Sequence, residues 1–331
     1  MKTNLFIGKN QNKKIIEEIK NSIENKENLL VLNNDEIYYN FYKKELEKNN
    51  YNIYVLNLKD SEKSNSFNPL MLPYSYYIQG KKDKSIDLIT ALAKEIFKED
   101  NEIDPFWSNS AIDYFIALTL ILFKEGKKEE INLGSIQAML TLAERKIDET
   151  SIIRKYFDNL DLLDSIYITG SSIVYAPADT RGSIMSVTKQ KLNMYCVREM
   201  LLNNLCGNEI NLNNITSNTA IFIINSDSKL LNKISNILID EVAFLNIPFT
   251  YYLNIDKSSC IYGLENIIEK NKVFISVSYQ ETLEEIYGKN ILNLFENKEK
   301  INCEDIVINN KELPISKINN KKYFNFEEFM N

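Results

Sequence analysis

The stretch TNLFIGKNQNKKII, residues 3–16, decides the fold of this chain. The apolar run Thr3–Ile7 has the length of a short buried strand, and a polar loop follows it. In residues 13–24 isoleucines then recur at the three- and four-residue spacing of one helix face. A strand, a loop and a helix in this order begin a βαβ unit and predict a parallel sheet.

The loop has the position of a P-loop, whose pattern is G-x-x-x-x-G-K-[S/T]. In that motif the glycines let backbone N–H groups surround phosphates, the lysine binds the outer phosphates and the hydroxyl binds Mg²⁺. Gly8 and Lys14 fall at the first glycine and the lysine, whereas Lys13 replaces the second glycine and Ile15 the hydroxyl residue. These residues alone leave two interpretations open, an ordinary βα turn and a decayed phosphate loop.

Strand and helix patterns alternate at both ends of the chain and give way to helical patterns in the middle. Apolar runs at 29–32 and 52–58 continue the first unit, and the alternation returns from 219 to 277. We therefore expect an α/β fold with a mostly parallel sheet flanked by helices, built from both ends of the chain. The expected domains are 1–85 with 205–300 (α/β), 86–204 (an all-helical insertion) and 301–331 (a tail with a strand at Asp305–Ile308).

Composition excludes several classes of site. The 331 residues contain no histidine, so histidine catalysis, Ser-His-Asp triads and histidine metal ligands are excluded. The four cysteines form no C-x-x-C pair, so no metal site is expected. A net charge of -7 argues against a generally basic nucleic-acid surface. The most apolar stretch, 114–123, is shorter than the roughly 20 residues of a membrane span, so no span and a cytoplasmic location are expected.

Several segments, in order, resemble the TraG/TraD-type coupling proteins of type IV secretion, which are RecA-like P-loop ATPases. The similar segments are NIYVLNLK (52–59), SFNPL (66–70), DPFWSNSA (104–111), TRGSIMS (180–186) and TAIFII (219–224). The family is membrane-anchored, forms ring hexamers and uses ATP to deliver DNA and relaxase to the secretion channel. The resemblance therefore implies a RecA-like nucleotide-binding domain, an oligomer and, as partners, a coupling-protein ring, a relaxase and DNA. It also implies attachment to the inner face of the membrane through such a partner.

The family's catalytic positions are only partly retained. The resemblance places Glu36 at an acid after the second strand, Asp256 at the Mg²⁺-orienting aspartate of Walker B, and Gln280 near the γ-phosphate. Lys257 stands where the family has the glutamate that polarises water. Arg181 has two interpretations: it reaches a neighbour's nucleotide in a ring, or it caps or pairs with Asp179.

These departures favour a coupling-protein-like component that has lost ATPase activity and acts by binding protein or DNA. In this interpretation Gly8, Lys14 and Glu36 are vestigial nucleotide-binding residues, and Asp256 and Gln280 are vestigial catalytic residues. ATP and Mg²⁺ bind weakly at most. The alternative is an active ATP-driven DNA-transfer motor that uses non-standard nucleotide ligands.

Overall fold

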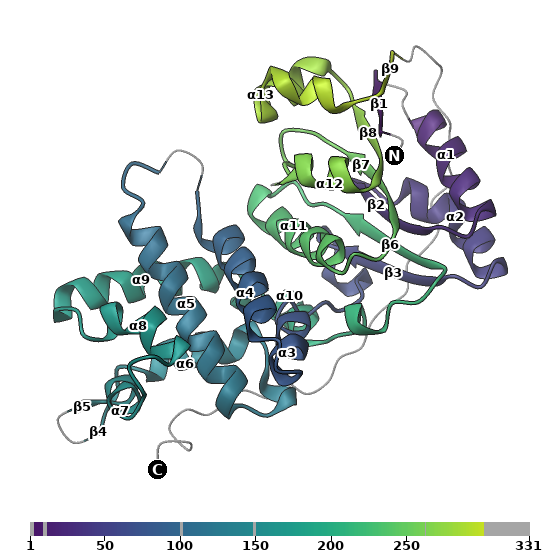
Figure 1. The fold of residues 1–331 in the computed structure, drawn as a ribbon. Helices are drawn as coiled ribbons and strands as arrows, with labels where there is room; N and C mark the ends of the chain where they lie inside the picture. The colour runs from purple at the N-terminus through teal and green to yellow at the C-terminus, as the bar shows by residue number, and fades with distance from the viewer. Residues whose placement is uncertain (1–2, 9–11, 100–101, 148–149, 262, 301–331) are drawn as a thin grey trace. The chain divides into compact units, whose positions relative to one another are not determined.

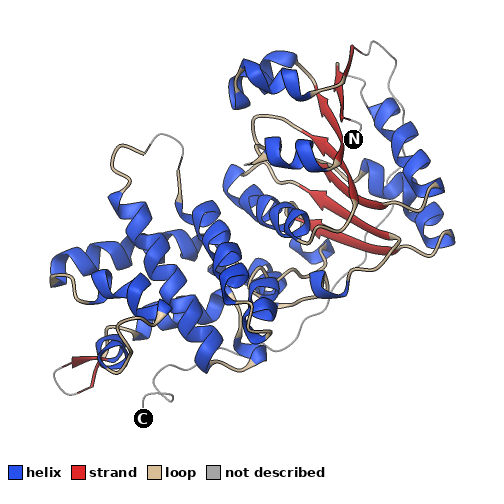
Figure 2. Cartoon of the chain, viewed as in Figure 1, coloured by secondary structure: helices blue, strands red, loops and turns tan. Residues whose placement is uncertain are grey.

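The computed structural model describes residues 3–8, 12–99, 102–147, 150–261 and 263–300. These residues form two compact units (Figures 1 and 2). The sheet unit comprises the described residues of 3–65 and 214–300, and the helical unit comprises those of 66–213. The predicted tail, with its strand at Asp305–Ile308, lies outside the described residues.

The sheet unit contains a seven-stranded sheet in the order β3-β6-β2-β7-β8-β1-β9, in which all neighbours are parallel. Val31 of β2 pairs with Phe222 of β6, so segments about 190 residues apart along the chain are adjacent in the sheet. The prediction of one parallel sheet built from both ends of the chain is confirmed. Its strands are β1 (Thr3–Ile7), β2 (Asn28–Asn33), β3 (Asn52–Asn57), β6 (Thr219–Ile224), β7 (Phe249–Asn254), β8 (Lys272–Val277) and β9 (Asn297–Lys300).

Helices cover both faces of this sheet. Figure 1 shows α1 (Asn12–Glu24) and α2 (Ile37–Lys48) on one face. The other face carries α11 (Lys229–Phe244), α12 (Leu264–Lys270) and α13 (Gln280–Tyr287). The isoleucines of α1 and the tyrosines of α2 pack on the strands in one buried cluster, which explains why α1 needs its isoleucines on one side. Two short 3₁₀ helices, Ser61–Lys63 and Lys289–Leu294, complete the unit.

The helical unit is arranged around α5 (Phe106–Glu125), which packs against α4, α6, α8 and α9. By length and composition α5 is long and apolar enough to cross a membrane, which the sequence count of ten apolar residues did not reveal. However, 72% of its most apolar window is buried inside the unit, as expected for the core helix of a folded domain. The other helices are α3 (Met71–Ile78), α4 (Lys82–Phe97), α6 (Leu133–Leu142), α7 (Ile152–Asp158), α8 (Ser165–Val174), α9 (Ala178–Cys196) and α10 (Glu199–Cys206), with 3₁₀ helices at Lys128–Glu130 and Leu212–Asn214.

Three details differ from the sequence prediction. Along the chain, the boundaries between the units fall at 65/66 and 213/214, whereas the sequence predicts 85/86 and 204/205. Residues 66–85 belong to the helical unit because α3 packs on α4 and the backbone N–H of Phe67 donates to the carbonyl of Asn204 at 2.8 Å. The helical unit also contains a two-stranded antiparallel ribbon, β4 (Lys146–Ile147) with β5 (Thr150–Ser151). Finally, the sequence pattern of residues 181–203 predicts a single helix, whereas the structure has two, since α9 ends at Cys196 and α10 begins at Glu199.

Candidate functional site

The predicted site residues of the sheet unit follow the carboxyl ends of its strands. Gly8 follows β1, Glu36 lies between β2 and α2, Asp256 follows β7 and Gln280 opens α13 after β8. Because β8 lies between β7 and β1 in a parallel sheet, the loops after these strands share one edge. In open α/β sheets this edge is where ligands bind.

Gly8 begins the predicted phosphate loop in a backbone conformation that favours glycine. Its φ is +142°, and its N–H donates to the carbonyl of Val277 at 3.0 Å, which extends the pairing of β1 with β8 by one residue. Residues 9–11 of the loop lie outside the described residues. Gly8 therefore ends the pairing of β1 with β8 at the place where a phosphate loop begins.

Lys14 and Ile15 point to different environments in the first turns of α1. Nζ of Lys14 lies 3.8 Å from Oε2 of Glu17, and the Lys14 side chain is 41% exposed. Ile15 is 1% exposed and belongs to the core between α1 and the sheet. The Ile15 side chain therefore packs in the core and contributes to the stability of the fold. It has no oxygen that could bind a cation.

Asp256 is surrounded by hydrogen-bond donors from its own loop. Its Oδ1 accepts from the N–H and Oγ of Ser258 at 2.7 and 2.6 Å, and from the N–H and Oγ of Ser259, both at 2.9 Å. Its Oδ2 accepts from Nδ2 of Asn34, which follows β2. Burial acts to raise the pKa of Asp256, but the hydrogen bonds from Ser258, Ser259 and Asn34 outweigh it and lower the pKa.

The asparagines that end β2, β3 and β7 form hydrogen bonds along this edge. Nδ2 of Asn254 donates to Oδ1 of Asn33 at 2.6 Å, and Nδ2 of Asn33 donates to Oδ1 of Asp35 at 2.7 Å. Glu36 stands at the N-cap of α2, where its Oε1 accepts from Nδ2 of Asn57 at 3.5 Å. Polar groups of the chain itself thus bind one another along this part of the edge, whereas Oδ1 of Asn34 is buried without a hydrogen-bond partner among the described residues.

Lys257 and Gln280 both have acidic partners on α13. Nζ of Lys257 lies 2.6 Å from Oε2 of Glu285, with both side chains more than half exposed. Nε2 of Gln280 donates to Oε1 of Glu284 at 2.7 Å, one helical turn further along α13. Lys257, which the sequence resemblance aligns with the family's water-polarising glutamate, is therefore a cation paired with an acid.

Arg181 belongs to the helical unit, whereas the other predicted site residues belong to the sheet unit. Its Nε lies 3.1 Å from Oε2 of Glu144, and its Nη1 donates to the carbonyl of Ala176 at 3.1 Å. The pairing partner is thus Glu144 and not the predicted Asp179. This ion pair ties α9 to the end of α6.

The structure adds four residues that the sequence interpretation missed: Asn34, Ser258, Ser259 and Glu285. A signal for the two serines was present, because an aspartate followed two and three residues later by serine is typical of a turn closed by the aspartate side chain. No local pattern identifies Asn34 as a partner of Asp256, since 222 residues separate them.

The residues at this edge do not fit a Mg²⁺–nucleotide in the usual P-loop manner. Mg²⁺ prefers oxygen ligands, from carboxylates and hydroxyls. Here the hydroxyl position is the buried Ile15, and Oδ1 of Asp256 already accepts four hydrogen bonds. Among the described residues, no group of three or more histidine, cysteine, aspartate or glutamate side chains could hold a metal ion.

A family model described as Type IV secretory system Conjugative DNA transfer matches residues 18–246. The match covers more than half of the 331 residues, so the chain belongs to this family of conjugative coupling proteins. The resemblance seen in the sequence is thereby confirmed. Glu36 and Arg181 lie within the matched residues, whereas Gly8, Lys14, Asp256 and Gln280 lie outside them.

Solved structures of the coupling protein TrwB have a similar fold, which confirms the RecA-like P-loop class. The unbound monoclinic form of bacterial TrwBdeltaN70 has a TM-score of 0.55 at 8% identity, with 88% of this chain and 65% of that chain covered. TrwB in complex with ADP and Mg²⁺ has a TM-score of 0.56 at 9% identity, with 88% and 67% covered. This chain therefore spans about two thirds of the length of these structures. No curated protein matches the chain.

Proposed function

We propose that this chain is a conjugative coupling-protein component that no longer hydrolyses ATP and acts by binding protein or DNA. Its expected partners are a coupling-protein ring, a relaxase or another part of the secretion apparatus, and oligomerisation is part of the proposal. The expected location is the cytoplasmic side of the membrane, where a membrane-bound partner holds it. Nucleotide and Mg²⁺ binding is weak at most.

The single observation that carries this proposal is the set of hydrogen bonds that the carboxylate of Asp256 accepts from its own chain. Phosphoryl transfer depends on loop amides, a lysine, Mg²⁺ and a group that positions water. The carboxylate that would orient Mg²⁺ is instead held by Ser258, Ser259 and Asn34. Lys257, at the water-positioning place, pairs with Glu285.

A specific observation also supports the alternative, an active motor with non-standard ligands. Gly8, Lys14, Asp256 and Gln280 all follow carboxyl ends of strands in one parallel sheet, which supports this alternative. TrwB, which has a similar fold, has been solved with ADP and Mg²⁺ and with the ATP analogue ADPNP. A motor of this kind would release Asp256 from its serines when nucleotide binds.

The test is Mg²⁺-dependent phosphate release by the purified full chain, alone and with single- or double-stranded DNA. The variants are Lys14→Ala and Asp256→Ala, and Lys20→Ala is the matched control. Lys20 is another exposed lysine of α1 whose Nζ lies 3.9 Å from Glu24, so its loss changes a similar ion pair away from the loop. We expect all four proteins to release phosphate at the same background rate.

Turnover of about 1 s⁻¹, at the low end of working enzymes, would overturn the proposal if Lys14→Ala abolished it and Lys20→Ala did not. Fluorescent ATP binding with and without Mg²⁺ gives a second readout. Binding that Mg²⁺ strengthens tenfold or more would favour the motor. Binding that is indifferent to Mg²⁺ would support the degenerate component.

A further inference from the structure

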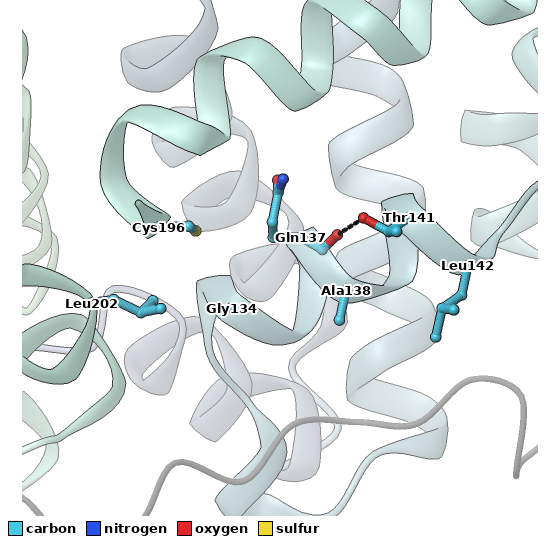
Figure 3. A pocket seen from close by; sticks show the side chains of 7 residues that line it. All are labelled: Gly134, Gln137, Ala138, Thr141, Leu142, Cys196 and Leu202. Carbon is cyan, nitrogen blue, oxygen red and sulfur yellow. Dashed lines mark hydrogen bonds between the residues drawn. The ribbon is translucent and has the colours of Figure 1, made fainter. Parts of the chain in front are cut away.

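One surface of the helical unit combines lysines, tyrosines and an exposed aliphatic side chain. It is formed by the end of α3, the start of α4 and the residues between them (Figure 1). We call residues 76–84, which read YYIQGKKDK, the α3–α4 turn. The turn differs from the hollow of about 380 Å³ beside α6, which is lined only by uncharged residues (Figure 3).

Three ammonium groups of the turn gather over two neighbouring tyrosine rings. Nζ of Lys81 and Nζ of Lys84 each lie 5.7 Å from the ring centroid of Tyr76. Nζ of Lys82 lies 5.8 Å from the ring centroid of Tyr77. These are cation–π distances, and all three lysines are exposed, so the charges are held together at the surface.

The backbone of the turn is fixed by its own hydrogen bonds. The N–H of Gly80 donates to the carbonyl of Tyr77, and the N–H of Lys81 donates to the carbonyl of Tyr76, both at 3.0 Å. Gly80 has a φ of +77°, and a Cβ built there would meet nothing within 4 Å. The ring of Tyr77 also packs near Phe123 of α5, with 5.6 Å between ring centroids. The turn is therefore a preformed surface that is open to a large partner.

The turn is basic in a chain whose net charge is -7. Within residues 76–84 three lysines face a single acid, Asp83, which gives the turn a net charge of +2. Asp87 follows one helical turn further along α4 and is also exposed. The excess of positive charge is therefore local, and it favours an anionic partner at this turn.

Two other carboxylates act on the turn through Tyr77, and both have partners of their own. Burial, followed by Asp164 and Glu125, raises the pKa of Tyr77. Oδ2 of Asp164 lies 3.6 Å from Nζ of Lys124, and Oε1 of Glu125 accepts from the hydroxyl of Tyr156 at 2.8 Å. These contacts direct both acids toward other groups of the helical unit.

The composition of the turn fits a membrane surface better than a nucleic acid. Ile78 is 63% exposed directly after the two tyrosines. Lysines attract anionic headgroups, tyrosines favour the membrane–water interface, and an aliphatic side chain can enter the acyl boundary. Nucleic-acid bases stack on open aromatic faces, whereas ammonium groups already lie over Tyr76 and Tyr77. An exposed isoleucine also offers nothing to a phosphate.

We propose that the α3–α4 turn binds the surface of a membrane that contains anionic phospholipids. Its lysines contact the headgroups, and Ile78 enters the boundary between headgroups and acyl chains. Each lysine near an anionic surface strengthens binding about fivefold, so this contact is weak alone and adds to any other membrane attachment. The proposal does not depend on loss of ATPase activity, because the turn lies in the helical unit and the P-loop residues lie in the sheet unit.

The test is flotation of the purified full chain with vesicles at low salt. One set of vesicles is phosphatidylcholine, and the other contains about 30% phosphatidylglycerol, which supplies the negative surface potential. The charge variant removes the lysines of the turn: Lys81→Gln, Lys82→Gln and Lys84→Gln. Its matched control removes three lysines of α2: Lys43→Gln, Lys44→Gln and Lys48→Gln. The control changes the net charge equally and also removes a cation–π contact, since Nζ of Lys43 lies 5.6 Å from the ring centroid of Tyr39.

A second pair of variants tests insertion of the aliphatic side chain. Ile78→Ser changes the turn, and Ile168→Ser is the matched control, because Ile168 is also 63% exposed and belongs to α8 of the same unit. Ile78→Ser should weaken binding to anionic vesicles at least threefold, whereas Ile168→Ser should leave it unchanged. Equal binding of these two variants would overturn insertion of Ile78.

We expect the wild type to float with the anionic vesicles and not with the neutral ones, and added salt should weaken the binding. The charge variant should bind at least tenfold more weakly than the α2 control. Equal binding of the wild type to both kinds of vesicle, or equal losses in the charge variant and its control, would overturn the proposal. A single-stranded oligonucleotide gives the remaining comparison. If the charge variant lost oligonucleotide binding and kept vesicle binding, the turn would be a nucleic-acid surface and the proposal would be wrong.

Discussion

The ammonium group of Lys257 lies 2.6 Å from the carboxylate of Glu285, so the residue that the sequence resemblance aligns with the family's water-polarising glutamate is a cation paired with α13. This ion pair joins the loop after β7 to the helix after β8. The substitution Lys257→Glu would therefore place a second carboxylate beside Glu285. It would introduce charge repulsion in addition to the acid that the family has at this position.

Lys257→Glu should lower the free energy of unfolding by up to about 1 kcal/mol, the upper range for an exposed ion pair. The double variant Lys257→Glu with Glu285→Lys should recover most of this loss, because it restores opposite charges. Urea unfolding at low salt measures both. A single variant as stable as the wild type would show that the pair has no energetic role.

Replacing Asp256 should show whether its carboxylate organises the loop. Asp256→Ala removes the acceptor for Ser258, Ser259 and Asn34, and we expect a loss of about 1.5–3 kcal/mol, typical of hydrogen bonds to a charged group. Asp256→Asn keeps an acceptor oxygen and should lose less. Denaturant unfolding at pH 7 distinguishes the two.

The lowered pKa of Asp256 also predicts a pH dependence. Its pKa in the folded protein is below the ordinary value of 3.8, so the stabilisation is complete above that value and is lost as the pH falls through the folded-state pKa. The stability difference between wild type and Asp256→Asn should therefore shrink in acid. A constant difference from pH 7 to pH 3 would contradict a lowered pKa.

Ile15 distinguishes a core residue from a vestigial metal position. Ile15→Ser should cost about 2–5 kcal/mol, the range for emptying a buried isoleucine site, and Ile15→Val about 0.5–1.5 kcal/mol. The side chain is 1% exposed, so both losses should appear in the absence of any nucleotide. If Ile15→Ser were neutral, the first turn of α1 would not depend on core packing.

Glu241 predicts a pH dependence of the opposite sign. Its side chain is buried in α11, and burial, followed by the nearby Asp240, raises its pKa well above 4.5. The contribution of protonated Glu241 to the free energy of unfolding is complete below pH 4.5. It is lost as the pH rises through the folded-state pKa. Glu241→Gln should therefore be more stable than wild type at pH 8, and the advantage should vanish near pH 4. Thermal unfolding across this range is the measurement.

Gly170 and Gly182 form a matched pair of helical glycines in the helical unit. A Cβ at Gly170 would lie 2.8 Å from Cβ of Ala117 on α5, whereas one at Gly182 meets nothing within 4 Å. Gly170→Ala should cost about 1–3 kcal/mol through overpacking. Gly182→Ala should stabilise the protein by about 0.5–1 kcal/mol through helix propensity. Thermal unfolding of both variants tests this contrast, and a neutral Gly170→Ala would mean that α5 and α8 can separate.

Most strands could be placed from the sequence because a parallel sheet buried on both faces needs short, continuous apolar runs. Three predicted strands, Thr3–Ile7, Thr219–Ile224 and Lys272–Val277, have the observed ends. The helices α3, α8 and α13 were missed, and the break between α9 and α10 was not seen. Such short or tertiary-dependent helices carry a weak periodic signal of their own.

The sequence by itself determined which atoms are absent: position 15 offers no hydroxyl, position 257 no carboxylate, and no histidine is present. These facts follow from the covalent chemistry of the side chains and hold in any fold. Only the tertiary structure decided what the remaining groups do. Asp256 keeps its carboxylate, but the folded chain brings Asn34 to it across 222 residues and aims two serines at it. Such contacts depend on strand order in the sheet, which local sequence patterns do not encode.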